Sequence, residues 1–484
     1  MERGPYNPSH PTILSAPHMT RPQKTLGDLK RDGIHVLPVR EELRKNLIDR
    51  MTRRERILPG IIGYDETVVP ELENAILAGH HMVFLGERGQ AKSRIIRALV
   101  ALLDEEVPVV AGCEINDDPY APICKRCAAL AAERGDELPI AWLGRQHRYG
   151  EKLATPDVSI ADLIGEIDPV KVAEGRYLAD EETIHYGLVP RTNRGIFAIN
   201  ELPDLTEKVQ VGLFNLMEEK DVQIKGYKVR LPLDLVIVAS ANPEDYTSRG
   251  RIITPLKDRF DVQIRTHYPK TIEDEIAIME QEVPARDYHS GPLRVPPFLK
   301  EILAQLTMEA RASNEINQSS GVSVRITINN YESILSNAEK RALRLREPEI
   351  VPRLSDLPSL FASTAGKIEV EYVGEEVKEE EVIERLLNRA ILKIFDKYVK
   401  VEDLKKAIEY FEQGWGVEVS DTMPSEEYRE GIRAIPGLRE GILALGSFES
   451  PGLMAAAAEF LLEGLHLHQK LNKEQEGARY VYRA

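Results

Sequence analysis

The sequence predicts an α/β domain built on a parallel sheet, followed by a mainly helical region. Three observations lead to this prediction. A strand–loop–helix pattern spans residues 82–100, and uniformly apolar runs at 195–199 and 235–241 each lead into polar side chains. After about residue 268 the apolar spacing is largely that of helices. Short, uniformly apolar runs are typical of strands buried on both faces, as in parallel sheets.

The composition describes a globular chain of two or three domains. Hydrophobic residues make up 42% and charged residues 29% of 484 residues. The formal net charge of −16 disfavours nucleic acid as a partner, although a basic channel inside a ring would escape this average. No apolar run of about 20 residues is present, which predicts no membrane association. Three cysteines and no signal-peptide pattern predict a reducing cytoplasm.

The stretch from Met82 to Val100 has the arrangement of a phosphate-binding loop. Backbone N–H groups of such a loop surround an anion. Lys92 is expected to reach the β- and γ-phosphates of a nucleotide, and the hydroxyl of Ser93 to bind Mg²⁺. An ordinary strand-to-helix turn is the alternative. The candidate nucleotide-binding residues are Gly86, Glu87, Arg88, Gly89, Gln90, Ala91, Lys92 and Ser93.

Ala91 departs from the usual pattern, which has glycine immediately before Lys-Ser. A methyl group fits this position if the backbone there is not left-handed. The alanine therefore weakens the match to a phosphate-binding loop without excluding it.

The apolar run 195–199 ends in Asn200 and Glu201, which predicts polar side chains at the carboxyl end of a buried strand. Glu201 is the candidate for polarising an attacking water. Asn200 stands where an aspartate usually helps to hold Mg²⁺. Its amide accepts the same hydrogen bond but carries no charge, so we expect lower metal affinity. A core strand with an edge glutamate is the alternative.

Asn242 follows the second apolar run, where its amide would orient the hydrolytic water or sense the γ-phosphate. Residues 160–167 are expected to form a helix. Hairpins are expected around Gly175 and over 222–231. The glycine-containing turn at 59–67 fits an adenine contact and a domain-entry turn equally well.

Cys113, Cys124 and Cys127 form a candidate zinc site. The pair separated by two residues resembles half of such a site, with Cys113 as a third thiolate. A fourth ligand is not evident, and His147 is the nearest histidine downstream. The alternative is a buried small Cys113 and an incidental pair, and without a fourth ligand the sequence favours the absence of zinc.

Along the chain, the phosphate-binding loop is followed by a hairpin, the strand that ends in Glu201, a second hairpin and the strand that leads to Asn242. After these come Asp258-Arg259-Phe260 and the helical segment with Arg325. This order resembles that of AAA+ ATPases, and within them the group of magnesium-chelatase ATPase subunits and MoxR proteins. The resemblance covers roughly residues 57–350. It implies Walker A at 86–93 and Walker B at Asn200–Glu201. It further implies the first sensor at Asn242, the arginine finger at Arg259 and the second sensor at Arg325. Arg249 and Arg251 compete for the finger role, and a salt-bridged Arg259 at a strand entry is the alternative.

The resemblance implies ATP and Mg²⁺ as cofactors. It also implies ATP hydrolysis in a homo-oligomeric ring, with a hexamer expected, that remodels a protein partner. In the family that partner commonly has a von Willebrand A domain. The rivals are a genuine ATPase subunit of a porphyrin-metal chelatase, a nucleotide-dependent scaffold with little turnover, and a DNA-translocating ring. The expected organisation is a flexible tail (1–24), a helical segment (25–56), the nucleotide domain (57–268), a helical lid (269–350) and a mainly helical C-terminal region (351–484).

Overall fold

A computed structural model describes most of the chain in two compact units. The first unit comprises residues up to Gly86 together with Ala91–Thr266, and the second comprises Glu87–Gln90 and His267–Ala484. Side chains at 221–224 and 227–230 are not described, nor is the predicted hairpin tip at Gly175. The described residues are 24–168, 183–218, 221–224, 227–243, 251–284, 286–288, 291–318, 321–371, 378–446, 448–476 and 479–484.

The first unit is built on a five-stranded sheet in the order β12-β2-β11-β8-β5. All of its neighbouring strands pair in parallel, which confirms the predicted fold class. The two predicted apolar runs form its central strands β8 and β11. The strands are β2 (Met82–Leu85), β5 (Tyr149–Leu153), β8 (Gly195–Asn200), β11 (Leu235–Ala241) and β12 (Val262–Arg265).

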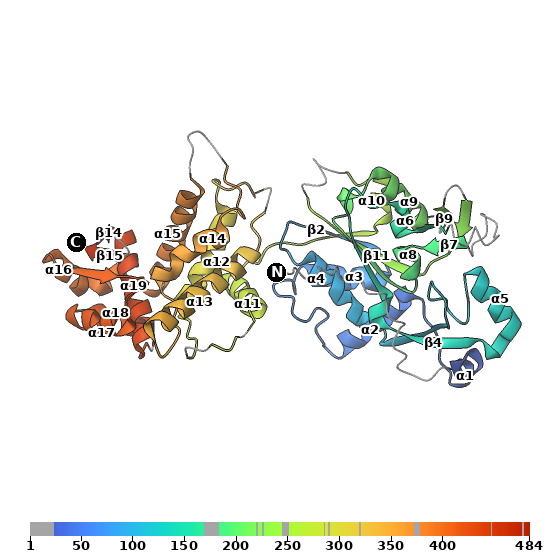
Figure 1. The fold of residues 1–484 in the computed structure, drawn as a ribbon, viewed down its shortest axis with the longest axis horizontal. Coiled ribbons are helices and arrows are strands. Elements are labelled where there is room, and N and C mark those ends of the chain that lie inside the picture. Colours follow the sequence, from blue (N-terminus) through green and yellow to red (C-terminus); the bar gives the residue numbers. More distant parts are fainter. Residues whose placement is uncertain are drawn as a thin grey trace, which may run out of the picture. The chain divides into compact units, whose positions relative to one another are not determined.

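Helices cover both faces of this sheet (Figure 1). Successive residues of β2 point to opposite faces, so Phe84 packs with α2, α3 and α4, whereas Val83 packs with the cluster that includes α9 and α10. This two-sided burial is why the central strands are apolar throughout. The helices are α2 (Val39–Thr52), α3 (Val68–Ala78), α4 (Lys92–Ala98), α9 (Glu207–Glu218) and α10 (Thr254–Arg259).

A smaller antiparallel sheet, in the order β1-β4-β3, lies outside the parallel sheet. In this sheet, β3 (Glu106–Val110) pairs with β4 (Pro139–Gly144). A short α5 (Lys125–Arg134) stands between them in the chain, and β1 (Lys24–Thr25) adds the third strand. Edge strand β5 of the parallel sheet contains Glu151 and Lys152, and the sequence pattern did not reveal it.

Two antiparallel pairs are inserted around α9. The predicted hairpin at 222–231 is confirmed as β9 (Asp221–Ile224) and β10 (Tyr227–Arg230). The expected helix at 160–167 is wrong beyond Leu163. Gly165 has φ of 125°, which ends the helix, and the following residues pair as β6 (Gly165–Ile167) with β7 (Ile184–Tyr186).

The second unit is mainly helical and has one large hydrophobic core. At residues 368–371, an isolated bridge joins Val370 to Ile316. A three-stranded antiparallel sheet, in the order β13-β15-β14, was not predicted. The unit contains α11 (Ile272–Glu282), α12 (Pro297–Ala312), α13 (Arg325–Leu345), α14 (Leu360–Thr364), α15 (Glu379–Tyr398), α16 (Lys405–Glu412), α17 (Ser425–Ala434), α18 (Leu438–Leu445), α19 (Pro451–Leu467), β13 (Gly416–Val419), β14 (Asn472–Glu476) and β15 (Arg479–Arg483).

Among the described residues, no helix combines the length and apolar character needed to cross a membrane.

The remaining elements of the first unit are α1 (Leu26–Arg31), α6 (Ile160–Leu163), α8 (Leu188–Arg191) and the 3₁₀ turns Leu99–Leu102, Gly135–Glu137, Arg145–Arg148 and Leu202–Asp204. The second unit adds the 3₁₀ turns Leu354–Ser359 and Val401–Leu404.

Candidate functional site

The loop after β2 begins at the sheet edge, where the Gly86 N–H donates to the Ala241 carbonyl of β11 at 3.2 Å. Gly89 has φ of 80° and Ala91 has φ of 55° and ψ of 14°. The backbone at Ala91 is therefore left-handed, which is not the conformation in which an alanine fits this loop without strain. Its left-handed conformation costs an alanine about 1–2 kcal/mol, because Cβ approaches the carbonyl oxygen.

Lys92, the first residue of α4, lies at the centre of a polar chain in the first unit. Its side chain is only 7% exposed. The Nζ donates to the Gly86 carbonyl and, at 2.7 Å, to Oδ1 of Asn242. The Nδ2 of Asn242 in turn donates to Oε2 of Glu201 at 2.8 Å. The structure thus brings three predicted site residues together, because they follow neighbouring parallel strands that end at one edge.

The two predicted Mg²⁺ ligands also meet. The Ser93 hydroxyl donates to Oδ1 of Asn200 at 3.2 Å, and the Ser240 hydroxyl approaches the same oxygen at 3.3 Å. Ser240 also accepts from the N–H of Glu201, whose φ is 56°. A left-handed glutamate is uncommon, and strain of this kind is frequent at functional sites.

Glu151 of β5 is a site residue that the sequence analysis missed. Its Oε1 accepts from Nδ2 of Asn200 at 2.5 Å, so the amide oxygen of Asn200 faces Ser93. Arg97 of α4 donates to both oxygens of Glu151, at 2.9 and 2.8 Å. The parallel register sets Glu151 beside Ala198 of β8, and this pairing cannot be read from the chain. Glu151 therefore places a negative charge next to the neutral Asn200.

This neighbour explains why position 200 tolerates an amide. The hydrogen bonds from Arg97 hold the pKa of Glu151 below its usual value, with a smaller contribution from Asn200. Glu151 is therefore ionised at neutral pH. An aspartate at 200 would set a second carboxylate against it, and like charges at hydrogen-bond distance repel. The charge expected at 200 stands instead on the adjacent strand.

The predicted arginines are not part of this polar chain in the described contacts. Arg259, at the end of α10, pairs with Glu218 and with Asp258, the latter at 2.8 Å, and lies over the ring of Phe214. These are the contacts of a salt-bridged residue. Arg251 is exposed, and Arg249 lies outside the described residues. Arg325 is exposed at the first position of α13, in the second unit.

Within the second unit, the loop segment Glu87–Gln90 packs on residues far along the chain. The Tyr268 hydroxyl donates to the Arg88 carbonyl at 2.9 Å. A Cβ added at Gly89 would lie 2.0 Å from Oγ of Ser323, so glycine is required there for space as well as for its φ. Ser323 accepts from the N–H of Arg325 at 3.2 Å, which supports the start of α13.

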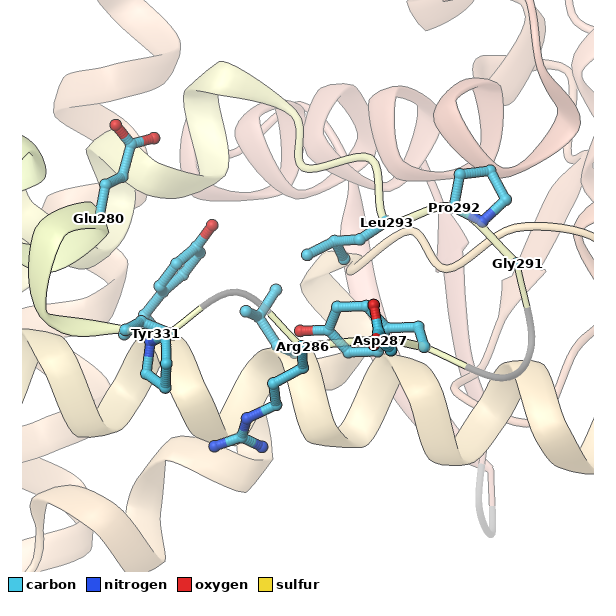
Figure 2. Close-up of a pocket in the computed structure, with 11 residues that line it drawn as sticks. Glu280, Arg286, Asp287, Gly291, Pro292, Leu293 and Tyr331 are labelled. Atoms are coloured by element: carbon cyan, nitrogen blue, oxygen red, sulfur yellow. The ribbon is translucent and has the colours of Figure 1, made fainter.

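The second unit also contains a cavity of about 710 Å³ between the end of α11 and α13 (Figure 2). Glu280, Arg286, Asp287, Leu293 and Tyr331 contribute to its wall. Burial raises the pKa of Tyr331 to about 12, so its hydroxyl stays protonated at neutral pH. None of the predicted nucleotide-site residues lines this cavity.

The residues present fit a magnesium nucleotide. Lys92 is buried, and the oxygens of Gly86 and Asn242 that accept from its ammonium group are neutral. The charged oxygens of a phosphate are stronger acceptors for an ammonium group than these neutral oxygens. Ser93 and Asn200 would hold Mg²⁺ with oxygen ligands, the kind this ion prefers.

No family model matches the chain, but curated proteins are similar to it in sequence. The chain is 31% identical over 247 residues to the magnesium-chelatase subunit ChlI of Nostoc sp., covering 50% of this chain and 60% of that protein. It is 25% identical over 297 residues to the chloroplastic subunit ChlI-1 of Arabidopsis thaliana, covering 55% and 66%. A ChlI homolog of Methanocaldococcus jannaschii is 27% identical over 199 residues, covering 40% and 50%.

The chain thus spans 60% of the length of the Nostoc relative. A solved structure of a putative ATPase from Cytophaga hutchinsonii is 16% identical, covering 74% of this chain and 97% of that one, with a TM-score of 0.31. The motif order, the parallel sheet and the sequence relatives agree. Over its nucleotide-binding part, the chain is similar to the AAA+ ATPases of the magnesium-chelatase ATPase-subunit and MoxR group.

Proposed function

We propose that this chain binds and hydrolyses ATP with Mg²⁺ in a ring of identical subunits and thereby remodels a protein partner. The observation that carries the proposal is the hydrogen-bonded chain from Lys92 through Asn242 to Glu201, beside the Ser93–Asn200 contact. These are the groups that phosphate binding, water positioning and metal binding require.

Each residue then has a defined task. Lys92 holds the β- and γ-phosphates, and Ser93 and Asn200 hold Mg²⁺, which when bound offsets the charge of the phosphate oxygens. Glu201 accepts the proton of the attacking water. Asn242 bridges Lys92 and Glu201, so it couples phosphate occupancy to the orientation of the carboxylate.

The ring proposal depends on Arg259. An arginine supplied by a neighbouring subunit neutralises charge on the transferring phosphoryl group. Arg259 is only about one-third exposed and is paired with Glu218 and Asp258. It would exchange these carboxylates for phosphate at a subunit boundary, while Arg325 would report the nucleotide state of its own subunit. We propose a hexamer in the cytoplasm and a partner with a von Willebrand A domain.

Two other functions each have an observation in their favour. The curated relatives are named as magnesium-chelatase subunits, which favours a genuine chelatase ATPase subunit. Asn200 lacks the usual charge, which favours a scaffold that binds ATP with little turnover. Steady-state ATP turnover separates the ATPase from the scaffold, and its dependence on added DNA tests for a translocating ring.

The binding step is tested with Lys92→Ala, with Lys208→Ala on the exposed part of α9 as the matched control. We expect the first variant to lose ATP binding in calorimetry and the second to retain it. Unchanged ATP affinity in a folded Lys92→Ala protein would contradict the phosphate-loop assignment.

The shared site is tested by mixing two inactive variants, Arg259→Ala and Glu201→Gln. Arginine fingers are worth about 10³–10⁵ in rate in other nucleotide hydrolases. In a mixed ring, some interfaces pair an intact Glu201 with an intact neighbouring Arg259, so turnover should partly return. No recovery on mixing, or a monomer with ATP bound in sedimentation, would rule out the shared site.

A further inference from the structure

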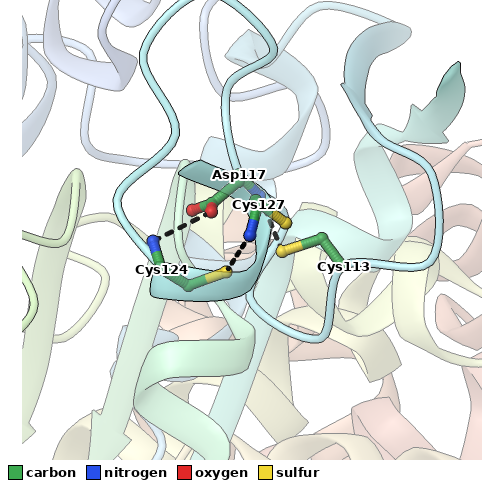
Figure 3. Close-up of side chains that lie close together, drawn as sticks. All are labelled: Cys113, Asp117, Cys124 and Cys127. Carbon is green, nitrogen blue, oxygen red and sulfur yellow. Dashed lines mark hydrogen bonds between the residues drawn. The ribbon is translucent and has the colours of Figure 1, made fainter. Parts of the chain in front are cut away.

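The three cysteines of the chain converge on one point of the first unit, although the sequence showed no complete site (Figure 3). One ligand atom from each of Cys113, Asp117, Cys124 and Cys127 lies within 4.8 Å of the others. Four ligands at about 2.3 Å around a tetrahedral ion lie about 3.8 Å apart, so this cluster needs little adjustment to surround one. Asp117 is the fourth ligand that spacing alone did not reveal.

Asp117 is the part of the cluster that points to a cation. Its side chain is fully buried. Oδ2 accepts from the backbone N–H of Cys124 at 3.0 Å, whereas Oδ1 is buried without a hydrogen-bond partner among the described residues. A buried carboxylate oxygen without a donor is costly. A metal ion bound between Asp117 and the sulfurs would remove that cost.

The backbone around the cysteines also fits thiolate ligands. The N–H of Asp117 donates to Sγ of Cys113 at 3.4 Å, and the N–H of Cys127 donates to Sγ of Cys124 at 3.3 Å. Cys124 caps α5, so two of the sulfurs lie at the positive end of a helix. Such bonds and dipoles stabilise the negative charge of metal-bound sulfur.

We propose that Cys113, Asp117, Cys124 and Cys127 bind one structural Zn²⁺. Three soft sulfur ligands and a carboxylate in a small tetrahedral space favour zinc over magnesium or calcium, which take oxygen ligands. The ligands of an iron–sulfur cluster surround several metal and sulfide atoms, so they do not converge this closely. With four protein ligands and buried surroundings, the site has no open position for catalysis.

The ion would fasten an irregular loop of the first unit that packs on the segment before β8. The loop from Ala111 to Cys124 contains no helix or strand of its own. Within it, Nδ2 of Asn116 donates to the Arg191 carbonyl at 2.7 Å, and the Ile115 carbonyl accepts from Asn193 at 2.9 Å. Arg191 and Asn193 directly precede β8, so zinc would stabilise the approach to the strand that carries Asn200.

Metal analysis of the full chain, purified without chelator and without added metal, tests the proposal directly. We expect about one zinc per chain in the wild type and less than about a tenth of that in Cys124→Ser. Asp117→Asn should bind zinc at least about tenfold more weakly than its matched control, Asp118→Asn. The exposed His147 lies outside the cluster, so His147→Ala should retain a full equivalent.

A second measurement on the unaltered protein keeps the proposal testable if the cysteine variants fail to fold. A thiol-modifying reagent should release zinc from the native wild type in step with modification of three thiols. Cobalt added to metal-free protein should give the absorption of a tetrahedral site with thiolate ligands. Native protein with under about a tenth of an equivalent of zinc, with iron instead, or with a disulfide among these cysteines would overturn the assignment.

Discussion

The nucleotide site and the cysteine cluster both bury polar side chains in the first unit. The two sites differ in whether those side chains find hydrogen-bond partners within the protein. At the nucleotide site, Lys92, Asn242 and Glu201 donate and accept within the protein. At the cysteine cluster, ligand atoms converge and one oxygen of Asp117 has no partner among the described residues. A site for an exchanging ligand must be stable when empty, whereas a site for a permanent ion relies on the ion.

The two sites also differ in how the chain assembles them. The nucleotide site draws residues from the ends of β8 and β11 and from the loop after β2, so the sheet register fixes their spacing. The cysteine cluster uses one loop and the first turn of α5. We therefore expect the nucleotide site to tolerate loss of one polar contact without unfolding, because the sheet holds the remaining residues in place.

Among the variants that test this comparison, Glu201→Gln should have the largest effect. Glutamine keeps a hydrogen-bonding side chain beside Asn242 but cannot accept the water proton, so ATP should still bind. Turnover should fall about 10²–10⁴-fold, the usual value of a positioned base. Steady-state hydrolysis and nucleotide affinity measure the two effects.

Glu207→Gln, on the exposed first turn of α9, is the control for Glu201→Gln and should hydrolyse ATP at the wild-type rate. If Glu201→Gln also retains wild-type turnover, Glu201 is not the base. Zinc content should be the same in both variants, because neither contacts the cysteine cluster.

A smaller effect is expected at Glu151. If its charge replaces that of the missing aspartate, Glu151→Gln should raise the Mg²⁺ concentration needed for half-maximal turnover about 10–100-fold, as for other residues that orient metal ligands. Glu105→Gln is the control, since that glutamate pairs with Arg145 on the surface. An unchanged Mg²⁺ midpoint in Glu151→Gln would show that this carboxylate does not serve the metal.

A double variant that moves the negative charge from position 151 to position 200 tests the same prediction more sharply. Asn200→Asp alone sets two carboxylates against each other, so one should take up a proton. Asn200→Asp combined with Glu151→Gln moves the charge back to position 200 and should restore the wild-type Mg²⁺ midpoint. If the double variant is no better than Glu151→Gln alone, the two positions do not share one charge.

The sequence predicted what depends on short stretches and missed what depends on pairing between strands. Uniform burial on both faces made β8 and β11 recognisable, and their polar ends pointed to Asn200, Glu201 and Asn242. Strand β5 is at the sheet edge and has no apolar run, so Glu151 went unnoticed. Asp117 cannot be recognised from the cysteine spacing, because only the fold of the loop brings it to the sulfurs.

The smallest predicted effect concerns the strained backbone at Ala91. Its left-handed conformation disfavours any side chain, and glycine removes the clash at the cost of extra freedom in the unfolded chain. The balance should make Ala91→Gly more stable by about 0.5–1 kcal/mol, measured by chemical unfolding without nucleotide.

Ala98→Gly is the matched control for Ala91→Gly, because Ala98 ends the same helix with ordinary helical angles. There glycine removes no strain, so the variant should lose about 0.5–1 kcal/mol. Opposite signs at two alanines of one segment would show that the phosphate-binding loop keeps its strain when no ligand is bound. Equal destabilisation at both positions would mean that the loop relaxes in the free protein and that only its bound form requires the left-handed turn.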